Sequence, residues 1–525
     1  MAASIQTLGT DFENSRDDTT VYTQSATPNT LTASPVSENT PLLPQKHRDG
    51  RLIYTISIIK AESWVLLRYA LPIFGTQILE YSLMMASVIS IGHISTDALA
   101  GSTLGSMTAN VTGLSIIHGF ASALDSLLPQ AWTSGRPENV GLWTQRMMVL
   151  VTLILVPILF IWLNAEAILL KLRQEPAIAH LAGVYLRWFS FSLPGQAISI
   201  ILRRFYQAQG LVHIPTMIMA VTAPINALLC WLLVWGPEPV NAGFIGAPIA
   251  SSLSFNLMAI ISLVYARWFI PNTAFHPINR QCFREIGKLF RLGLSGVGQI
   301  ASEWWSWEFV ALAASQLGPV PLAAQSVLLT SSSTAFQTPY SLGMATTVRV
   351  GNLLGSGQAQ MAKLAAETAI GMSLIIALTL STIFMTFRTN WGYLFNNDEN
   401  VASLVASVLP LVALFQVVDG ATAVSDGVLR ARGMLGLGAI INICSYYIIG
   451  LPVGVALAFW ADLGLKGLWA GLAIALFCAA AISIFVVYKT NWNLEVSKIN
   501  RKQRPSLSDI PFYGNQFRVY IIDTS

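Results

Sequence analysis

Residues 149–163 read VLVTLILVPILFIWL and carry no charge. The run is apolar on every side of a helix, whereas the strands of a membrane barrel alternate between apolar and polar residues and are shorter. A helix needs about 20 mostly apolar residues to cross the hydrocarbon core of a bilayer. This stretch therefore predicts a membrane-spanning helix.

Eleven further stretches of this kind surround it, so we expect an all-α membrane protein with twelve transmembrane helices. The expected spans are near residues 63–91, 99–128, 142–162, 178–201, 214–235, 246–269, 289–317, 322–342, 364–384, 401–429, 435–457 and 467–487. Several contain Pro or Gly, which bilayer helices tolerate where neighbouring helices satisfy the freed backbone groups.

The composition of the 525 residues supports this class and excludes others. Charged residues make up 11% of the chain, against roughly 25% in soluble domains, which argues against a soluble enzyme. The net charge of +4 is spread over short connectors rather than gathered in a patch, which argues against nucleic-acid binding. The 4 cysteines lie far apart and predict neither a disulfide framework nor a zinc site. No cofactor or metal is expected.

Lys and Arg in the connectors predict the orientation of the chain, because cytoplasmic loops accumulate them. These residues are frequent before the first span, in the middle connector and after the last span. The connectors expected outside hold few of them, and residues 92–98 hold none. Both termini are therefore expected in the cytoplasm, which an even number of spans allows.

An internal repeat divides the chain into two parts. Leu99-Ala100 recurs as Leu322-Ala323, and Gly210 recurs as Gly433, with the same offset in both cases. Because each repeat holds six spans, both begin on the same membrane side, as in transporters whose two bundles enclose a central cleft. A duplicated scaffold or channel is the alternative. The expected parts are an N-terminal tail (1–60), a first six-helix bundle (61–270), a connector (271–288), a second bundle (289–489) and a C-terminal tail (490–525).

The N-terminal tail is rich in Ser, Thr, Asn and Pro, so we expect residues 1–60 to be disordered. Within the tail, Glu38 stands four residues before the pair Leu42-Leu43. This string resembles the acidic dileucine signal that sorting adaptors read on membrane proteins bound for vacuoles or lysosomes. The alternative is a chance match, because so short a string arises often in a tail.

Several strings in and between the spans are characteristic. They are Asn110-Val-Thr-Gly113, Ala123-Leu-Asp-Ser126, Glu303-Trp-Trp-Ser-Trp-Glu308, Arg349-Val-Gly-Asn352, Asn397-Asp398, Gly427-Val-Leu-Arg430 and Gly450-Leu-Pro452. Together they resemble the eukaryotic branch of the multidrug and toxic compound extrusion (MATE) transporters over residues 63–490, and the Pro-Gln-Ala-Trp string that ends the second span suggests a fungal member. The major facilitator transporters also have twelve spans, but residues 130–142 lack their usual Gly, Asp and paired Arg pattern.

The resemblance implies two pseudo-symmetric bundles and an antiporter that exports organic compounds, often cationic and planar, in exchange for protons or, in some branches, sodium ions. The implied partners are the organic substrate, the coupling ion and the bilayer, with the chain as a monomer. The sequence departs from the family at three positions. Thr330 stands where some members carry a carboxylate, and Glu80 and Asp426 stand where neutral residues are common. These departures leave the substrate range and the number of protons open.

Carboxylates inside the spans are functional candidates, because an ionisable group deep in a bilayer costs several kcal/mol. Glu303 lies about half-way along the seventh span, and Asp419 lies just past the middle of the tenth. The resemblance matches both to positions that the family uses for ion coupling and cation binding. Glu308 follows Glu303 by five residues, about 140° around a helix. We therefore expect that these two glutamates do not both point squarely into one cleft.

Further site candidates come from the resemblance. They are Gln77, Asn110, Asp125, Trp304 and Tyr446. Asp125 is equally well explained as a buried carboxylate that holds a helix end. Trp304 and its neighbours Trp305 and Trp307 suit a flat organic cation beside a carboxylate, because aromatic faces attract cations, although packing against lipid or other helices explains them equally well.

Other polar or small residues in the spans favour structural roles. Asp426 is expected to pair with Arg430 one turn on, with an inward proton relay as the alternative. Glu80 and His118 are expected to be satisfied core groups rather than proton sites. The pattern Gly101-x-x-x-Gly105 predicts the close approach of two helices within a bundle.

Two rival functions belong to other classes. A membrane enzyme that transfers prenyl or phosphate groups needs clustered Asp to hold magnesium on phosphates, and the spans contain no Asp-x-x-Asp or His-Glu-x-x-His string, so no enzyme is expected. A lipid flippase of the same superfamily would favour a cationic cleft, whereas this cleft is expected to be acidic. We therefore expect proton-coupled export at the vacuolar or plasma membrane, with sodium coupling as the alternative.

The sorting hypothesis gives a first prediction. If adaptors read the dileucine string, replacing both Leu42 and Leu43 by Ala moves a fluorescently tagged protein from the vacuolar to the plasma membrane. Microscopy of both forms measures the change, and transport activity serves as the control, because the tail lies outside both bundles. An unchanged distribution removes the sorting role.

Overall fold

The computed structural model describes residues 47–271, 274–278, 280–395 and 397–503. Residues up to Tyr54 form a unit of their own, and the packing described below is that of the unit from Thr55 onward. The first bundle contains α1 (His47–Gly92), α2 (Thr96–Ala109), the π-helix η1 (Asn110–Leu114), α3 (Ser115–Ala121), α4 (Leu124–Thr133), α5 (Glu138–Leu163), α6 (Ala165–Lys171), α7 (Pro176–Phe189), α8 (Leu193–Ala208), α9 (His213–Trp235) and α10 (Gly246–Phe269).

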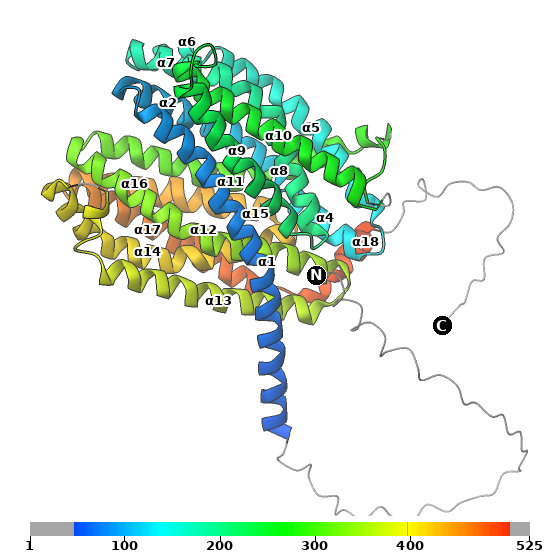
Figure 1. Cartoon of the computed structure of the whole chain (residues 1–525). Helices are drawn as coiled ribbons and strands as arrows, with labels where there is room; N and C mark the ends of the chain where they lie inside the picture. Colours follow the sequence, from blue (N-terminus) through cyan, green and yellow to red (C-terminus); the bar gives the residue numbers. More distant parts are fainter. Residues whose placement is uncertain (1–46, 272–273, 279, 396, 504–525) are drawn as a thin grey trace, which may run out of the picture. The chain divides into compact units, whose positions relative to one another are not determined.

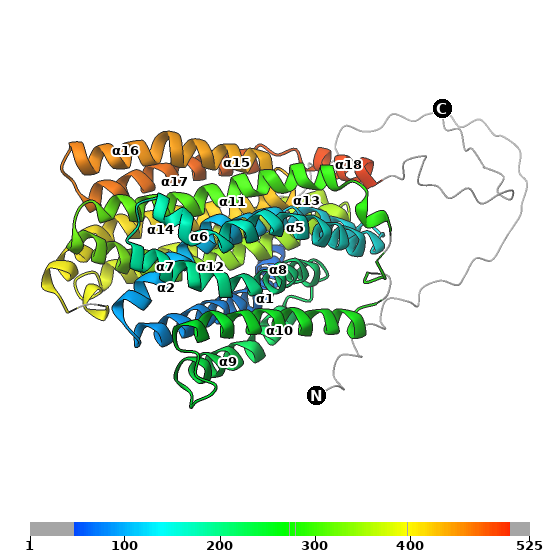
Figure 2. The ribbon, with the colours of Figure 1, turned by 90° about the horizontal axis from the view of Figure 1, so that it is seen from above.

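The second bundle begins after the middle connector (Figure 1). It contains α11 (Ile286–Ser315), α12 (Pro319–Gly355), α13 (Ala359–Thr386), α14 (Glu399–Ala431), α15 (Leu435–Ile443), the π-helices η6 (Cys444–Gly450) and η7 (Ala456–Trp460) with α16 (Leu451–Val455) between them, and α17 (Leu465–Tyr488). A last helix, α18 (Trp492–Gln503), follows it. Seen from above, α9 and α10 lie on the opposite side of the unit from α15, α16 and α17 (Figure 2).

The helices of the described chain form twelve long segments, because α2 continues through η1 and α3 to α4, α7 continues to α8, and α15 continues to η7. These segments match the twelve expected spans, so the expected all-α class is confirmed. Nine of the segments that the structure describes are long and apolar enough to cross a membrane by length and composition alone. The other three, α7 with α8, α11 and α12, carry several buried polar side chains, among them Gln196, Gln299 and Gln325.

The helix bounds agree with the internal repeat. α2 begins at Thr96 and α12 at Pro319. α7 begins at Pro176 and α14 at Glu399, so both pairs of helix starts are separated by the same length of chain. Within the first bundle α2 packs on α7 and α10 packs on α8 and α9, whereas in the second bundle α14 is central and packs on α12, α13 and α17.

The small-residue pattern on α2 permits close packing inside the first bundle, as expected. A Cβ added at Gly101 would lie 2.5 Å from the Cβ of Leu181 on α7. A Cβ at Gly105 would lie 2.8 Å from the ring of Tyr185, also on α7. Any larger side chain at either position would separate the two helices.

The two tails differ in part from the expectation. Helix α1 begins at His47, so the end of the segment expected to be disordered is helical. The apolar residues between Arg51 and Lys60 explain this, because they extend the first span toward the N-terminus. The dileucine string lies outside the described residues. In the C-terminal tail, Trp492 and Ile499 of α18 are buried against Val350 and Leu354 of α12.

A bidentate ion pair joins the bundles at the end where α1 enters. Arg349 on α12 donates to both carboxylate oxygens of Glu62 on α1, at 2.6 and 2.9 Å. The Glu62 side chain is 3% exposed. A buried charge in a protein interior needs such a partner, because removing it from water is costly.

A second ionic contact between the bundles lies near the same end. Asp125 on α4 accepts from the Nε of Arg204 on α8 at 2.9 Å, and its other oxygen lies 3.8 Å from the Nε of Arg430 on α14. The expected pair of Asp426 with Arg430 is wrong, since the described structure has no such ion pair. The Arg430 side chain extends to Asp125 across the contact between α4 and α14 instead.

Hydrogen bonds complete this contact. Together with the Glu62–Arg349 and Asp125–Arg430 pairs, they form what we call the closed interface. The Gln130 side chain donates to the backbone oxygen of Ala431 at 2.7 Å. The Thr133 hydroxyl donates to the backbone oxygen of Asn352 at 2.8 Å. Both bonds run from α4 to the second bundle, so the C-terminal ends of α4, α12 and α14 are held together.

The packing of α2 on α7 gives a second prediction. Gly101→Ala overpacks this contact, so we expect the free energy of unfolding to fall by ~1–3 kcal/mol, measured as a lower melting temperature of the purified protein in detergent. Gly371→Ala is the control, because a Cβ there meets nothing within 4 Å. Equal melting of the two variants contradicts the close approach.

The closed interface gives a third prediction. Arg349→Gln leaves Glu62 buried without a cation, at a cost on the order of 3 kcal/mol, so the two bundles should separate more often at this end. Hydrogen exchange read by mass spectrometry should then be faster in residues 125–134 and 349–356. Lys363→Gln, which removes an exposed pair within α13, should leave this exchange unchanged. Slow exchange in both variants shows that the Glu62 pair does not hold the interface.

Candidate functional site

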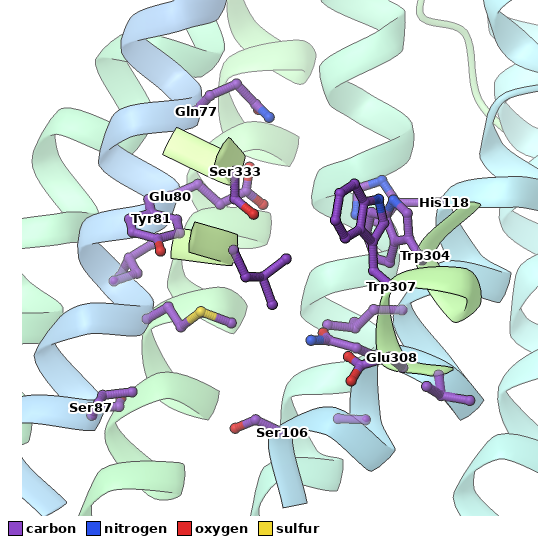
Figure 3. Close-up of a pocket in the computed structure, with 18 of the residues that line it drawn as sticks. Gln77, Glu80, Tyr81, Ser87, Ser106, His118, Trp304, Trp307, Glu308 and Ser333 are labelled. Carbon is purple, nitrogen blue, oxygen red and sulfur yellow. The ribbon is translucent and has the colours of Figure 1, made fainter. Parts of the chain in front are cut away.

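A cavity of about 480 Å³ lies between the two bundles. Its wall on the first bundle comes from α1, α2, η1, α3, α7, α8 and α10, and its wall on the second bundle comes from α11, α12 and α14. Figure 3 shows Glu80 and Tyr81 of α1 facing Trp304 and Trp307 of α11 across this space. A ligand in the cavity would therefore touch both bundles at once.

The cavity occupies the half of the unit farther from the closed interface. Along α1 its lining runs from Gln77 to Ile91, next to the short connector that follows α1. Along α11 it runs from Glu303 to Glu308, toward the C-terminal end of that helix. The bundles are thus apart at one end and fastened at the other.

The second-bundle wall carries three carboxylates, those of Glu303, Glu308 and Asp419. No basic group of the described chain lies within ion-pair distance of any of them, and their carboxylate oxygens accept no hydrogen bond there. Glu303 and Glu308 both line the cavity, although they stand about 140° apart around α11. The cavity extends around the exposed side of α11, so residues on two faces of this helix reach it.

The tryptophans beside Glu303 have different surroundings. The Trp304 ring packs on the imidazole of His118 with ring centres 5.6 Å apart, and both line the cavity. Trp305 instead donates from its ring nitrogen to the backbone oxygen of Val111 on η1 at 3.2 Å. Trp307 lines the cavity and packs edge-on against Trp469. Two of the three rings are therefore available to a ligand.

The first-bundle wall holds a paired carboxylate. Glu80 accepts from the guanidinium of Arg203 on α8 at 2.8 Å, and Gln77 accepts from the same group at 3.2 Å. The Gln77 amide also donates to Gln337 of α12 at 3.3 Å, across the two bundles. Glu80 thus has a partner, as expected, yet it also lines the cavity, which sequence reasoning did not anticipate.

The predicted site residues divide into two groups. Those that line the cavity are Glu303, Asp419, Glu308, Gln77, Asn110 and Trp304. Asp125 lies in the closed interface instead, and Tyr446 is buried in η6 behind the cavity wall with 2% of its surface exposed. Asn110 begins η1, and π-helical turns inside long helices are frequent at functional sites.

Sequence reasoning missed the contribution of α12. This helix lines the cavity with six residues: Leu329, Ser332, Ser333, Phe336, Gln337 and Tyr340. The signal was the polar run from Ser331 to Thr334 in an otherwise apolar segment. Among the described residues, no group of three His, Cys, Asp or Glu side chains is arranged to hold a metal ion.

Comparison with known proteins identifies the family. The MatE family model matches residues 72–232 and 297–456, one segment in each bundle. An uncharacterized transporter of Schizosaccharomyces pombe is 37% identical over 84% of this chain and 82% of its own length. Multidrug and toxin extrusion protein 2 of Mus musculus is 32% identical over 83% of this chain and 76% of its own.

A solved structure agrees with these relatives. The crystal structure of a eukaryotic MATE transporter superposes with a TM-score of 0.80 and 30% sequence identity, and the match covers 85% of this chain and 99% of that one. The twelve helices, the two bundles and the cavity between them are therefore those of a transporter and not of an enzyme. The chain belongs to the MATE family of multi-pass membrane transporters.

Proposed function

We propose that this transporter exports organic cations in exchange for protons by alternating access. The observation that carries the proposal is the second-bundle wall of the cavity, where Glu303, Glu308 and Asp419 have no cationic partner in the described structure. Aromatic rings beside unpaired carboxylates attract flat organic cations. A proton and an organic cation would then compete for the same carboxylates, so each weakens the binding of the other.

The cavity and the closed interface lie at opposite ends of the bundles, which supports alternating access, and the basic residues near the termini suggest its orientation. The basic residues near the termini favour a cytoplasmic location for both ends of the chain, which places the closed interface inside and the cavity toward the outside. In this outward-facing state, Glu303 and Asp419 take up protons and the cation leaves. After the closed interface separates and the opposite end closes, the carboxylates release protons to the more alkaline cytoplasm and bind the next cation.

Two alternatives are less well supported. A lipid flippase needs cationic groups for lipid phosphates, and the described cavity lining contains no Lys or Arg. The guanidinium of Arg203, which reaches the cavity residue Glu80, is already paired with it. A sodium site needs several oxygen ligands around one ion, and among the described residues no group of three His, Cys, Asp or Glu side chains is arranged to hold one. The sorting experiment on Leu42 and Leu43 would show whether the transporter works in the vacuolar or the plasma membrane.

The proposed coupling gives a fourth prediction. Asp419→Asn removes a proton-exchanging group but preserves the size of the side chain, so uphill transport driven by an acid exterior should be abolished. Binding of an organic cation should persist through Glu303 and lose most of its pH dependence. Uptake of tetraphenylphosphonium into proteoliposomes of known orientation, under an imposed pH gradient or an imposed sodium gradient, measures both driving forces.

Glu303→Gln and Lys363→Gln serve as companion variants in this assay. Glu303→Gln should reduce cation transport much more than transport of a neutral aromatic compound, because only the cation interacts with the lost charge. Lys363→Gln, far from the cavity lining, should behave as wild type. Wild-type transport driven by sodium alone, or undiminished concentration of the cation by Asp419→Asn, rejects the proposal.

A further inference from the structure

A buried carboxylate outside the cavity remains without a role in this mechanism. Asp426 lies on α14 seven residues after Asp419, on nearly the same helix face and about 10 Å nearer the closed interface. Its side chain is buried, with 5% of the residue exposed, and does not line the cavity. A carboxylate at this depth in a membrane protein is costly unless it is neutral or paired, and marks a functional candidate.

The surroundings of Asp426 contain no ion-pair partner in the described chain. Arg430, one turn further along α14, extends to Asp125 in the closed interface. The hydroxyl of Ser483 on α17 donates to the Asp426 carboxylate over a long distance, 3.4 Å. Glu62 and Asp125 have arginines within ion-pair distance, whereas Asp426 has none among the described residues.

Two amides lie beside the Asp426 carboxylate with unused hydrogen-bonding groups. They belong to Gln299 on α11 and Asn442 on α15. The Gln299 side chain is 1% exposed, and its oxygen has no hydrogen-bond donor among the described residues. Asn442 donates to the backbone oxygen of Gln299 at 3.0 Å, which leaves its own side-chain oxygen without a partner.

These amides suit a carboxyl group that changes its protonation state. An amide nitrogen can donate to an ionised carboxylate, and an amide oxygen can accept from a protonated carboxylic acid. Gln299 and Asn442 together offer both kinds of atom to Asp426. An ionised aspartate has no O–H and can donate to neither amide oxygen, whereas a protonated aspartate can donate to one of the two.

The site is aligned with the coupling carboxylates of the cavity. Gln299 stands one helical turn before Glu303 on α11, and Asn442 stands one turn before Tyr446 at the junction of α15 and η6. α14 brings Asp426 and Asp419 to the same region. Each of these three helical segments thus has one residue near the cavity and a second residue one or two turns nearer the closed interface.

The charges around Asp426 act in opposite directions. The ionisable groups that interact with it are Glu303, Asp419, Arg430 and Tyr446. α17 faces it with Ser483, and the basic groups Arg349 of α12 and Lys363 of α13 are held by Glu62 and Glu367. Arg430 attracts the ionised carboxylate, whereas the carboxylates of Glu303 and Asp419 repel it.

We propose that Asp426, held between Gln299 and Asn442, is a third proton-binding site of the second bundle, and that its proton controls cation affinity through charge without contacting the substrate. The only bond that forms is between a proton and a carboxylate oxygen of Asp426, and the same bond breaks on release. With Asp426 ionised, the negative potential at Glu303 and Asp419 is stronger and the cavity binds a cation more tightly. The inference rests on the proposed proton–cation exchange and deepens it.

Linked proton release tests this site. The full-length protein, purified in detergent in weak buffer with a pH indicator dye, is titrated with tetraphenylphosphonium at a series of pH values. We expect Asp426→Asn to release fewer protons per bound cation than wild type, by up to ~1, and to bind the cation several-fold more weakly at the alkaline end of the range. The difference in affinity should become smaller as the pH falls, because a protonated wild-type carboxyl is neutral like the asparagine side chain.

Three further variants make the result decisive. Asp426→Ser, smaller and also neutral, should behave like Asp426→Asn and replaces it if the asparagine variant does not fold. Glu367→Gln, which removes an exposed carboxylate of α13, should release as many protons as wild type. Wild-type proton release and pH dependence in either folded Asp426 variant overturn the inference. Asp419→Asn separates the two proposals: normal release in this variant as well rejects proton coupling itself, whereas a loss confined to Asp419→Asn rejects only the role of Asp426.

Discussion

The structure depends on one constraint. A charged side chain buried among membrane helices either has a partner of opposite charge or has a function that requires it to be unpaired. The chain meets this constraint in two ways. Where the bundles touch, Glu62 and Asp125 are paired with arginines. Where the bundles are apart, Glu303 and Asp419 face the cavity without a partner in the described structure.

This distribution connects the fold with transport. The internal repeat supplies two bundles of similar helices, and the pairs at one end hold them together while a cavity forms at the other. The ion pairs and the cavity lie on different parts of the same helices, so in the proposed alternating access the pairs would separate as the cavity closes. α12 illustrates this, since Tyr340 lines the cavity and Arg349, about two and a half turns further on, holds Glu62.

The number and positions of the spans were predicted well from the sequence, because helix length and hydrophobicity are set by the bilayer and not by neighbouring helices. The twelve spans, the repeat and the close approach at Gly101 followed from spacing alone. The partners of buried charges could not be predicted in the same way. Arg430 was matched to Asp426 because they are one turn apart, whereas the folded chain offers it Asp125, which is distant in sequence but adjacent across the bundles.

The cavity lining shows the same limit. Glu303, Asp419 and Trp304 were identified because a motif surrounds them. The contribution of α12 was missed, because its serines and aromatic residues carry no motif and gain meaning only when that helix faces α1 and α11. Glu80 was given one role, although its position on the cavity wall lets it pair with Arg203 and border the ligand space at once.

The use of ion pairs rather than apolar side chains at the closed interface has a kinetic consequence. Exposing apolar surfaces to water costs a large amount of free energy. Separated carboxylates and guanidiniums instead become hydrated, and their hydration recovers much of the free energy lost with the pairing. In the proposed exchange, the two states could therefore lie within a few kcal/mol of each other, the range in which a minor state stays populated. A small difference in occupancy of the cavity would then decide which end of the transporter is open.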